Sequence, residues 1–327
     1  MVEAVVPARP RDTAVRTGLT MVVCAAILFG INGSVSKVVL LAGLPAQRLT
    51  ELRSAGAFIG LAAFLLVWAP RRLKMRRSEI KVLALYGIVG FAFVQWFYFV
   101  SIQRLPVGVA LLIEYTAPLL VALWARFGEH EHVRPQVWWA LVLALSGLVL
   151  VAQVWDGLTL DRIGVLAGFL AAGSLAFYFV LGEKKVKDDR DAISLVCLAF
   201  GFATLFWSVL QPWWTFPWHV LGEQTSLLGN LSDKEAPVWV LCLVIIVGGT
   251  IIPFALMIGS LAHLPATQAG VAAMTEPVVA TIVAWAWLGE TLAVAQVVGG
   301  LVVLLGIGLA QTARSPQAST VDERSAA

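Results

Sequence analysis

Long apolar runs, separated by short segments that contain proline, glycine or charge, cover nearly the whole chain. A helix needs about 20 mostly apolar residues to cross a bilayer, because about 30 Å of hydrocarbon is covered at about 1.5 Å per residue. Ten runs are long enough, at roughly 17–41, 48–68, 80–103, 106–128, 135–155, 162–183, 192–212, 237–262, 266–288 and 292–311. None alternates as membrane barrel strands would. The pattern predicts an all-α integral membrane protein with ten transmembrane helices.

The segments between these runs are mostly short, so we expect consecutive helices to lie antiparallel in a compact bundle. Only 213–236 is long enough to hold structure of its own. Residues 1–16 are expected to form a cytoplasmic N-terminal segment. They lack the layout of a cleavable signal, and the apolar run that follows is too long for a signal peptide. Residues 312–327 are small and polar and predict a disordered cytoplasmic tail.

The distribution of Lys and Arg predicts the orientation, because short cytoplasmic loops carry an excess of them. With the N-terminus inside, the external loops hold four basic residues, Arg48, Arg104, Arg162 and Lys234. Two more, Lys37 and Arg53, fall within predicted helices. The cytoplasmic segments hold the remaining 17 of the 23. This asymmetry predicts that both termini are cytoplasmic and that the number of crossings is even.

Composition excludes several other classes. The chain is 59% hydrophobic and 13% charged, with a mean hydropathy of +0.86, whereas soluble domains carry about 25% charged residues. No basic stripe indicates a nucleic-acid partner, and no GxxxxGK[ST] loop indicates ATP binding. His130 and His132, beside Glu129 and Glu131, lack a Cys or a remote third ligand, which favours a solvated loop over a metal site. We expect no cofactor.

The chain carries an internal repeat at a spacing of 159 residues. It matches Ser101 with Ser260, Leu105 with Leu264, Pro106 with Pro265, Thr116 with Thr275, Pro118 with Pro277, Glu131 with Glu290 and Gly147 with Gly306. The two halves, 17–155 and 162–311, then hold five predicted helices each. Because five is odd, the second half would enter the membrane from the opposite side. Such an inverted repeat is a frequent plan of secondary transporters.

Three stretches resemble the EamA-type members of the drug/metabolite transporter superfamily. They are LFGINGSVSKVVL at 28–40, SIQRLPVGVALLIEYTAPLLVAL at 101–123 and TEPVVATIVAWAWLGETL at 275–292. The spacing of proline, glycine and glutamate residues at 106–118 looks like that of the threonine/homoserine exporters. The matching residues are Gln103, Pro106, Gly108, Glu114, Pro118, Glu276, Pro277, Gly289 and Glu290. The resemblance, from which GEHEH at 128–132 departs, implies ten helices, two EamA repeats and export of small metabolites or amino acids.

Two glutamates lie near the middle of predicted helices, Glu114 in the fourth and Glu276 in the ninth. An ionisable group at that depth costs several kcal/mol, so it usually faces a bundle interior or a wet cavity. One interpretation is that they bind a substrate ammonium or carry a coupling proton. The other is that each is a neutral, hydrogen-bonded packing carboxyl. The 159-residue spacing matches Glu114 with Ala273 and Glu276 with Ala117. The two glutamates are therefore not at equivalent positions, but lie one turn apart on matching faces of their helices.

Other polar residues within the predicted helices are weaker candidates. Asn32, Gln95, Tyr98 and Tyr178 could line a cavity for an organic solute, or could pack and hydrogen-bond between helices. Arg53 could attract a carboxylate. A hairpin of the first two helices predicts a salt bridge between Lys37 and Glu51. Pro118 and Pro277 can kink their helices and free backbone carbonyls.

Together these patterns predict a secondary transporter in the cytoplasmic membrane, not an enzyme. It would export a small polar metabolite, with an amino acid as the leading substrate class and protons as a candidate coupling ion. A lipid-linked-sugar or lipid-headgroup translocator is an alternative within transport. An integral-membrane enzyme is the alternative from another class. It would need clustered His or Asp at an interface, and the chain has four His with no convincing acid partner.

Overall fold

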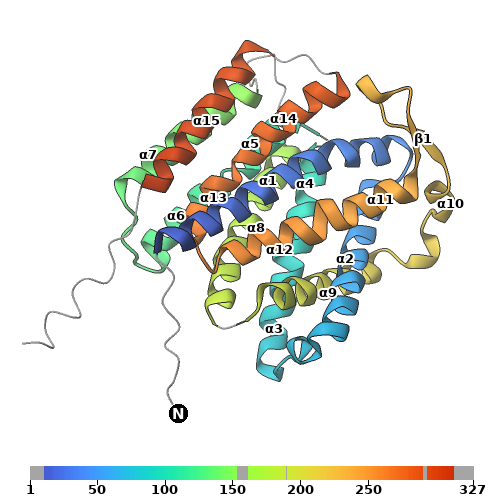
Figure 1. The fold of residues 1–327 in the computed structure, drawn as a ribbon, viewed down its shortest axis with the longest axis horizontal. Coiled ribbons are helices and arrows are strands. Elements are labelled where there is room, and N and C mark those ends of the chain that lie inside the picture. Colours follow the sequence, from blue (N-terminus) through green and yellow to red (C-terminus); the bar gives the residue numbers. More distant parts are fainter. Residues whose placement is uncertain are drawn as a thin grey trace, which may run out of the picture.

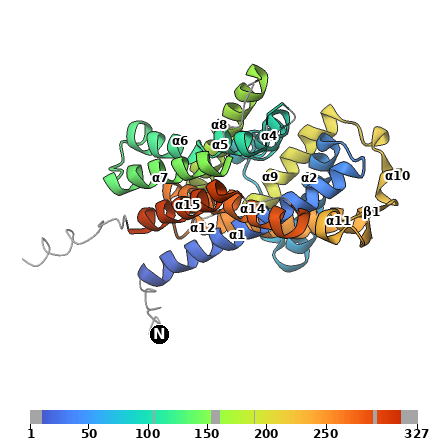
Figure 2. The ribbon, with the colours of Figure 1, turned by 90° about the horizontal axis from the view of Figure 1, so that it is seen from above.

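The computed structural model describes residues 11–102, 104–105, 107–152, 161–188, 190–289 and 293–312 as a nearly all-helical bundle (Figures 1 and 2). Eight helical stretches are long and apolar enough to cross a membrane: Thr13–Leu41, Ala46–Trp68, Arg77–Ser101, Ala110–Gly128, Arg162–Lys187, Ala192–Leu210, Val238–Ser260 and Ala266–Leu288. Two shorter apolar helices, Pro135–Val151 and Val294–Ala310, occupy the fifth and tenth predicted positions. The chain is therefore a multi-helix membrane protein, and ten crossings stay a prediction.

The elements follow the predicted runs closely. The first half contains α1 (Arg11–Leu41), α2 (Ala46–Trp68), α3 (Arg77–Leu85), α4 (Val94–Ile102), α5 (Val107–Glu114), α6 (Ala117–Leu123) and α7 (Pro135–Ala152). The second contains α8 (Arg162–Lys187), α9 (Ala192–Leu210), α10 (Trp218–Leu221), α11 (Val238–Ile246), α12 (Ile252–Ser260), α13 (Ala266–Ala273), α14 (Thr275–Leu288) and α15 (Val294–Thr312). Helix α1 begins at Arg11, earlier than the predicted residue 17.

The segment between α9 and α11 has structure of its own, as its length predicts. It contains α10 and a two-stranded antiparallel hairpin, β1 (Gln224–Ser226) with β2 (Glu235–Pro237), in which Thr225 lies opposite Ala236. Asn230 Nδ2 donates to the Ala286 carbonyl at 3.0 Å, and Trp287 Nε1 donates to the Leu227 carbonyl at 2.9 Å. These bonds fix the hairpin to the end of α14, on the right of Figure 1.

The two halves are interrupted at matching positions. The fourth and ninth predicted helices each break shortly before the repeated proline, α5 from α6 and α13 from α14. At the breaks Thr116 Oγ1 donates to the Ile113 carbonyl at 2.7 Å, and Thr275 Oγ1 donates to the Ala272 carbonyl at 2.8 Å. The third and eighth helices each contain a π-helical segment, Tyr86–Phe93 and Val247–Ile251. The 159-residue spacing therefore relates local structure as well as sequence.

The halves also exchange equivalent contacts. Helix α1 packs against α12, α13 and α14 of the other half, and α8 packs against α4, α5 and α6. Helix α2 packs against α9, and α7 against α15. Figures 1 and 2 both draw α7 and α15 side by side. Each half therefore completes the packing of the other.

Helices α1 and α8 run in opposite directions. A Cβ on Gly18, near the start of α1, would lie 2.7 Å from Leu264 Cγ, so α1 begins beside the turn that precedes α13. Near the end of α8, Glu183 Oε2 accepts a hydrogen bond at 2.8 Å from the backbone N–H of Ala266, the first residue of α13. The start of α1 and the end of α8 thus lie at one end of the bundle.

Glycines bring the backbones of α7 and α15 into contact. A Cβ on Gly147 would lie 2.6 Å from the Gly299 carbonyl oxygen and 2.7 Å from the Val303 nitrogen. A Cβ on Gly299 would lie 2.6 Å from the Gly147 oxygen. Gly306, the repeat partner of Gly147, approaches the Ala140 carbonyl in the same way, at 2.8 Å. Small residues let helix backbones approach closely in membranes.

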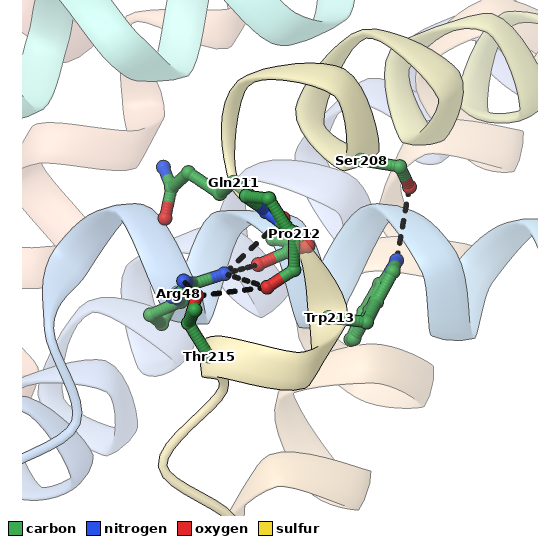
Figure 3. Close-up of polar contacts among 7 residues, drawn as sticks. Arg48, Ser208, Gln211, Pro212, Trp213 and Thr215 are labelled. Carbon is green, nitrogen blue, oxygen red and sulfur yellow. Dashed lines mark hydrogen bonds and ion pairs between the residues drawn. The ribbon is translucent and has the colours of Figure 1, made fainter.

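Polar contacts join α2 and α9 at both ends. At the start of α2, Arg48 Nη1 donates to the Gln211 and Pro212 carbonyls at 3.2 and 3.5 Å, and Nη2 donates to Thr215 Oγ1 (Figure 3). At the start of α9, Ser194 Oγ donates to the carbonyl of Arg72 at 2.6 Å. The start of α2 therefore binds the segment that follows α9, and the start of α9 binds the segment that follows α2.

The predicted salt bridge between Lys37 and Glu51 is wrong. Glu51 Oε2 pairs with Arg48 Nη1 at 2.7 Å, and its Oε1 has no hydrogen-bond partner within the part of the chain that the structure describes. Arg48 lies three residues before Glu51, on the same face of α2, where side chains at helical spacing meet. The prediction compared only the depths of Lys37 and Glu51 across the hairpin of the first two helices, so it did not consider this nearer partner.

Candidate functional site

A cavity of about 530 Å³ lies between the two halves, with walls from α1, α2, α4, α5, α7, α8 and α12–α15. All seven candidate residues line it: Asn32, Arg53, Gln95, Tyr98, Glu114, Tyr178 and Glu276. Small-molecule sites have volumes of about 300–1,000 Å³. The polar residues chosen from helix interiors thus surround one chamber of solute size, and their roles stay predictions.

The cavity extends toward the end of the bundle that carries the β-hairpin. Lys37 of the last turns of α1, Leu288 at the end of α14 and Gln296 at the start of α15 all line it. Farther from that end lies an aromatic cluster, in which the ring of Phe254 lies 5.1 Å from Phe29 and 6.0 Å from Tyr178. The cavity therefore runs from this cluster toward one face of the molecule.

Glu276 lies in the first turn of α14, where the positive end of the helix dipole stabilises a carboxylate. Its Oε2 accepts a hydrogen bond from the Tyr115 hydroxyl at 2.7 Å. Tyr115 also lines the cavity but was not among the sequence candidates. It directly follows Glu114, about 100° farther around the helix, and both residues reach the cavity.

Glu114 is the last residue of α5 and is 8% exposed. Among the residues that the structure describes, its carboxylate makes no hydrogen bond or ion pair. It faces Tyr98 and Glu276, with which its charge interacts. The two glutamates therefore differ, because Glu276 has a hydroxyl donor and Glu114 has none.

Arg53 of α2 is 6% exposed and is the guanidinium of this cavity. Its Nε donates to Thr250 Oγ1 at 3.0 Å, and its Nη2 donates to the Gly249 carbonyl at 3.2 Å. Its charge interacts with that of Glu276. Ionic interactions are strong where water is scarce, and Arg53 shares the cavity wall with three other charged residues, Glu114, Glu276 and Lys37.

Several buried oxygens on the cavity wall have no protein partner among the described residues. These are Asn32 Oδ1, Ser36 Oγ, Gln95 Oε1 and the Tyr178 hydroxyl. Asn32 fits only because Gly249 has no side chain, since a Cβ there would lie 2.0 Å from Asn32 Oδ1. Buried polar atoms are normally satisfied by protein or water. The wall therefore offers oxygens to water or to a polar solute.

Three residues that carry the sequence resemblance, Gln103, Pro106 and Glu290, lie outside the described residues. Of the others, Glu114, Glu276 and Pro277 line the cavity. Within the described ranges, no group of three or more His, Cys, Asp or Glu side chains could hold a metal ion.

A multi-pass bundle of two matching halves around a solute-sized polar cavity defines the class of a membrane transport protein. The chain belongs to the EamA-like transporter family, whose model matches residues 16–153 and again 162–312. It therefore contains two EamA repeats.

Relatives of the chain are named as transporters. The threonine/homoserine exporter RhtA of Escherichia coli K12 is 25% identical over 314 residues, covering 90% of this chain and 92% of its own. An uncharacterized transporter of Archaeoglobus fulgidus is 28% identical over 300 residues, covering 90% and 96%. The uncharacterized transporter YdfC of Bacillus subtilis is 26% identical over 267 residues, covering 81% and 83%. A crystal structure with 20% sequence identity matches with a TM-score of 0.70, over 92% of this chain and 99% of that one.

Proposed function

We propose that the protein is a secondary transporter that exports a small polar metabolite, with amino acids as the leading class, across the cytoplasmic membrane. The observation that carries the proposal is the cavity between the two EamA repeats, lined by two glutamates, an arginine, a lysine and several oxygens that have no partner among the described residues. Similarity to RhtA, an exporter of threonine and homoserine by name, favours amino acids. We infer that a proton gradient or the membrane potential drives transport by this chain, because its sequence has no phosphate-binding loop for ATP.

We further propose ten crossings, an inverted repeat and cytoplasmic termini. The opposite directions of α1 and α8 and the bias of Lys and Arg support this arrangement. The β-hairpin end of the bundle then faces outward, and the cavity extends to the outside. Transport would alternate between this state and one in which the cavity extends inward.

The arrangement predicts the location of reporter fusions. Fusions after Arg76 and Lys187 should report the cytoplasm, and a fusion after Asn230 should report the outside. Paired phosphatase and fluorescent-protein fusions, which are active on opposite sides, make the measurement. A cytoplasmic signal at Asn230 would contradict the proposed topology.

Counterflow in proteoliposomes tests the function. Proteoliposomes that contain the purified protein are loaded with unlabelled solute, and uptake of the labelled solute is followed. The panel consists of amino acids, nucleosides, cationic drugs and a short-chain lipid-linked sugar. We expect accelerated exchange of amino acids, dependent on the protein. Exchange confined to the lipid-linked sugar would favour the headgroup translocator, and exchange of no panel member would contradict the proposal.

A further inference from the structure

Arg53 is anchored through only part of its guanidinium group. Nε and Nη2 hold Thr250 and Gly249, whereas Nη1 makes no hydrogen bond within the described part of the chain. Arginine carries five N–H donors in a planar fork suited to carboxylates. Because Arg53 is buried and lines the cavity, the donors of Nη1 are available to a ligand there.

Pro253, in the first turn of α12, directly follows the π-helical segment Val247–Ile251 and Ile252. Proline has no N–H, so it leaves a carbonyl of this interrupted stretch without its helical donor. The Gly249 carbonyl, in the same segment, accepts the hydrogen bond from Arg53 Nη2. The Thr250 hydroxyl, which accepts from Nε, itself donates to the Ile245 carbonyl at 2.8 Å. The interrupted helix therefore supplies a fixed acceptor pair.

The cavity also separates its charges. Arg53 makes no ion pair within 4.0 Å with Glu114 or Glu276, although its charge interacts with that of Glu276 from farther away. A contact ion pair with either glutamate would have occupied the Nη1 donors of the guanidinium group. The gap leaves room for a ligand that carries both charges, with its ammonium group toward the glutamates.

We propose that Arg53 is the specificity-determining residue that receives the solute carboxylate through Nη1, and that Pro253 is the residue that positions it. This inference rests on the proposed function and narrows it to solutes that are zwitterions. An amine without a carboxylate would leave the buried Nη1 donors unpaired. A carboxylic acid without an amine would face two glutamates.

Three matched solutes test the role of Arg53: threonine, its decarboxylated amine 1-aminopropan-2-ol and its deaminated acid 3-hydroxybutyrate. Binding of each to the purified full chain in nanodiscs is measured by calorimetry. Hydrogen bonds to charged groups contribute about 1.5–3 kcal/mol, so Arg53→Gln should weaken threonine binding about 10- to 100-fold. Binding of the amine should change less than about threefold. Arg53→Lys, which keeps the charge but loses the fork, should give an intermediate loss and covers the case in which Arg53→Gln fails to fold.

Each outcome decides the matter. Selective loss of threonine binding supports the proposal. Equal losses for threonine and the amine would make Arg53 a counter-ion of Glu276 and overturn it. A wild-type protein that binds the amine as well as threonine would also overturn it, while the proposed transport stands. If the wild type binds none of the three yet exchanges other solutes in counterflow, the inference fails alone, and failure of both assays removes the function as well.

The positioning role has its own readout. Pro253→Ala restores an N–H that can bond to carbonyls of the π-helical segment, Gly249 among them, so Arg53 should lose part of its anchor. We expect the preference for threonine over the amine to fall about tenfold at unchanged protein yield. Thr250→Val should act similarly, and Thr250→Ser, which keeps the hydroxyl, should preserve the preference. An unchanged preference in both Pro253→Ala and Thr250→Val would contradict the positioning role.

Discussion

Replacing Glu114 with Gln should reduce solute exchange about 10- to 100-fold while the amount of protein in the membrane stays nearly constant. The carboxylate is buried and has no hydrogen-bond donor among the described residues, so it is available to a solute ammonium or to a proton. Gln keeps the volume and removes the charge, and hydrogen bonds to charged groups contribute about 1.5–3 kcal/mol. Initial rates of counterflow at matched protein density, repeated across external pH, provide the measurement.

Two further variants serve as a control and a comparison for Glu114→Gln. Glu129→Gln, in an exposed loop outside the cavity, should leave exchange unchanged and controls for loss of one negative charge. Glu276→Gln keeps an acceptor for the Tyr115 hydroxyl and asks whether both halves contribute. Exchange at the wild-type rate by Glu114→Gln, at every pH, would remove Glu114 from the mechanism and leave Glu276 as the better candidate.

Substituting Gly147 with Ala should destabilise the bundle by about 2–3 kcal/mol, because the added Cβ meets backbone atoms of Gly299 and Val303 that cannot rotate away. For a chain of this size, such a loss lowers the midpoint of thermal unfolding by about 3–5 °C. Size-exclusion chromatography of detergent-solubilised protein after heating provides the measurement.

Gly308→Ala is the matched control, since Gly308 lies on α15 and a Cβ there would meet no atom of the described residues within 4 Å. Alanine is the better helix former by about 1 kcal/mol, so this variant should be as stable as the wild type or more stable. Equal midpoints for Gly147→Ala and Gly308→Ala would show that the close approach of α7 and α15 contributes little to stability.

The positions of the helices and of seven polar residues on the cavity wall could be predicted because both depend on periodic, local rules. Apolar length defines a membrane helix, and a polar side chain at mid-bilayer is forced toward the bundle interior. Glu114, Glu276 and Arg53 therefore converge although they are far apart in sequence. The repeat carried a further signal, since Thr116 and Thr275 make the same bond at the same place in each half.

Features that depend on interruptions of the helix were not predicted. The bond between Tyr115 and Glu276 lies at the break between α5 and α6 and joins residues that are far apart in sequence. The Gly249 carbonyl that Arg53 binds lies in a π-helical segment, which hydropathy cannot locate. The Lys37–Glu51 pairing failed because helical neighbours within α2 were not weighed against partners across the hairpin.

The exchange of contacts between the halves has a consequence for biosynthesis. Helix α1 is made first, and its partners α12–α14 are made near the end of synthesis, before only α15 among the helices described. Roughly 250 residues separate them, which at about 5–20 residues per second is about 12–50 s of translation. During that interval the polar face of α1, with Asn32 and Ser36, has to be sheltered from lipid by the insertion machinery or by other early helices. Truncated nascent chains that end before α12 should therefore expose this face to crosslinking, and full-length chains should not.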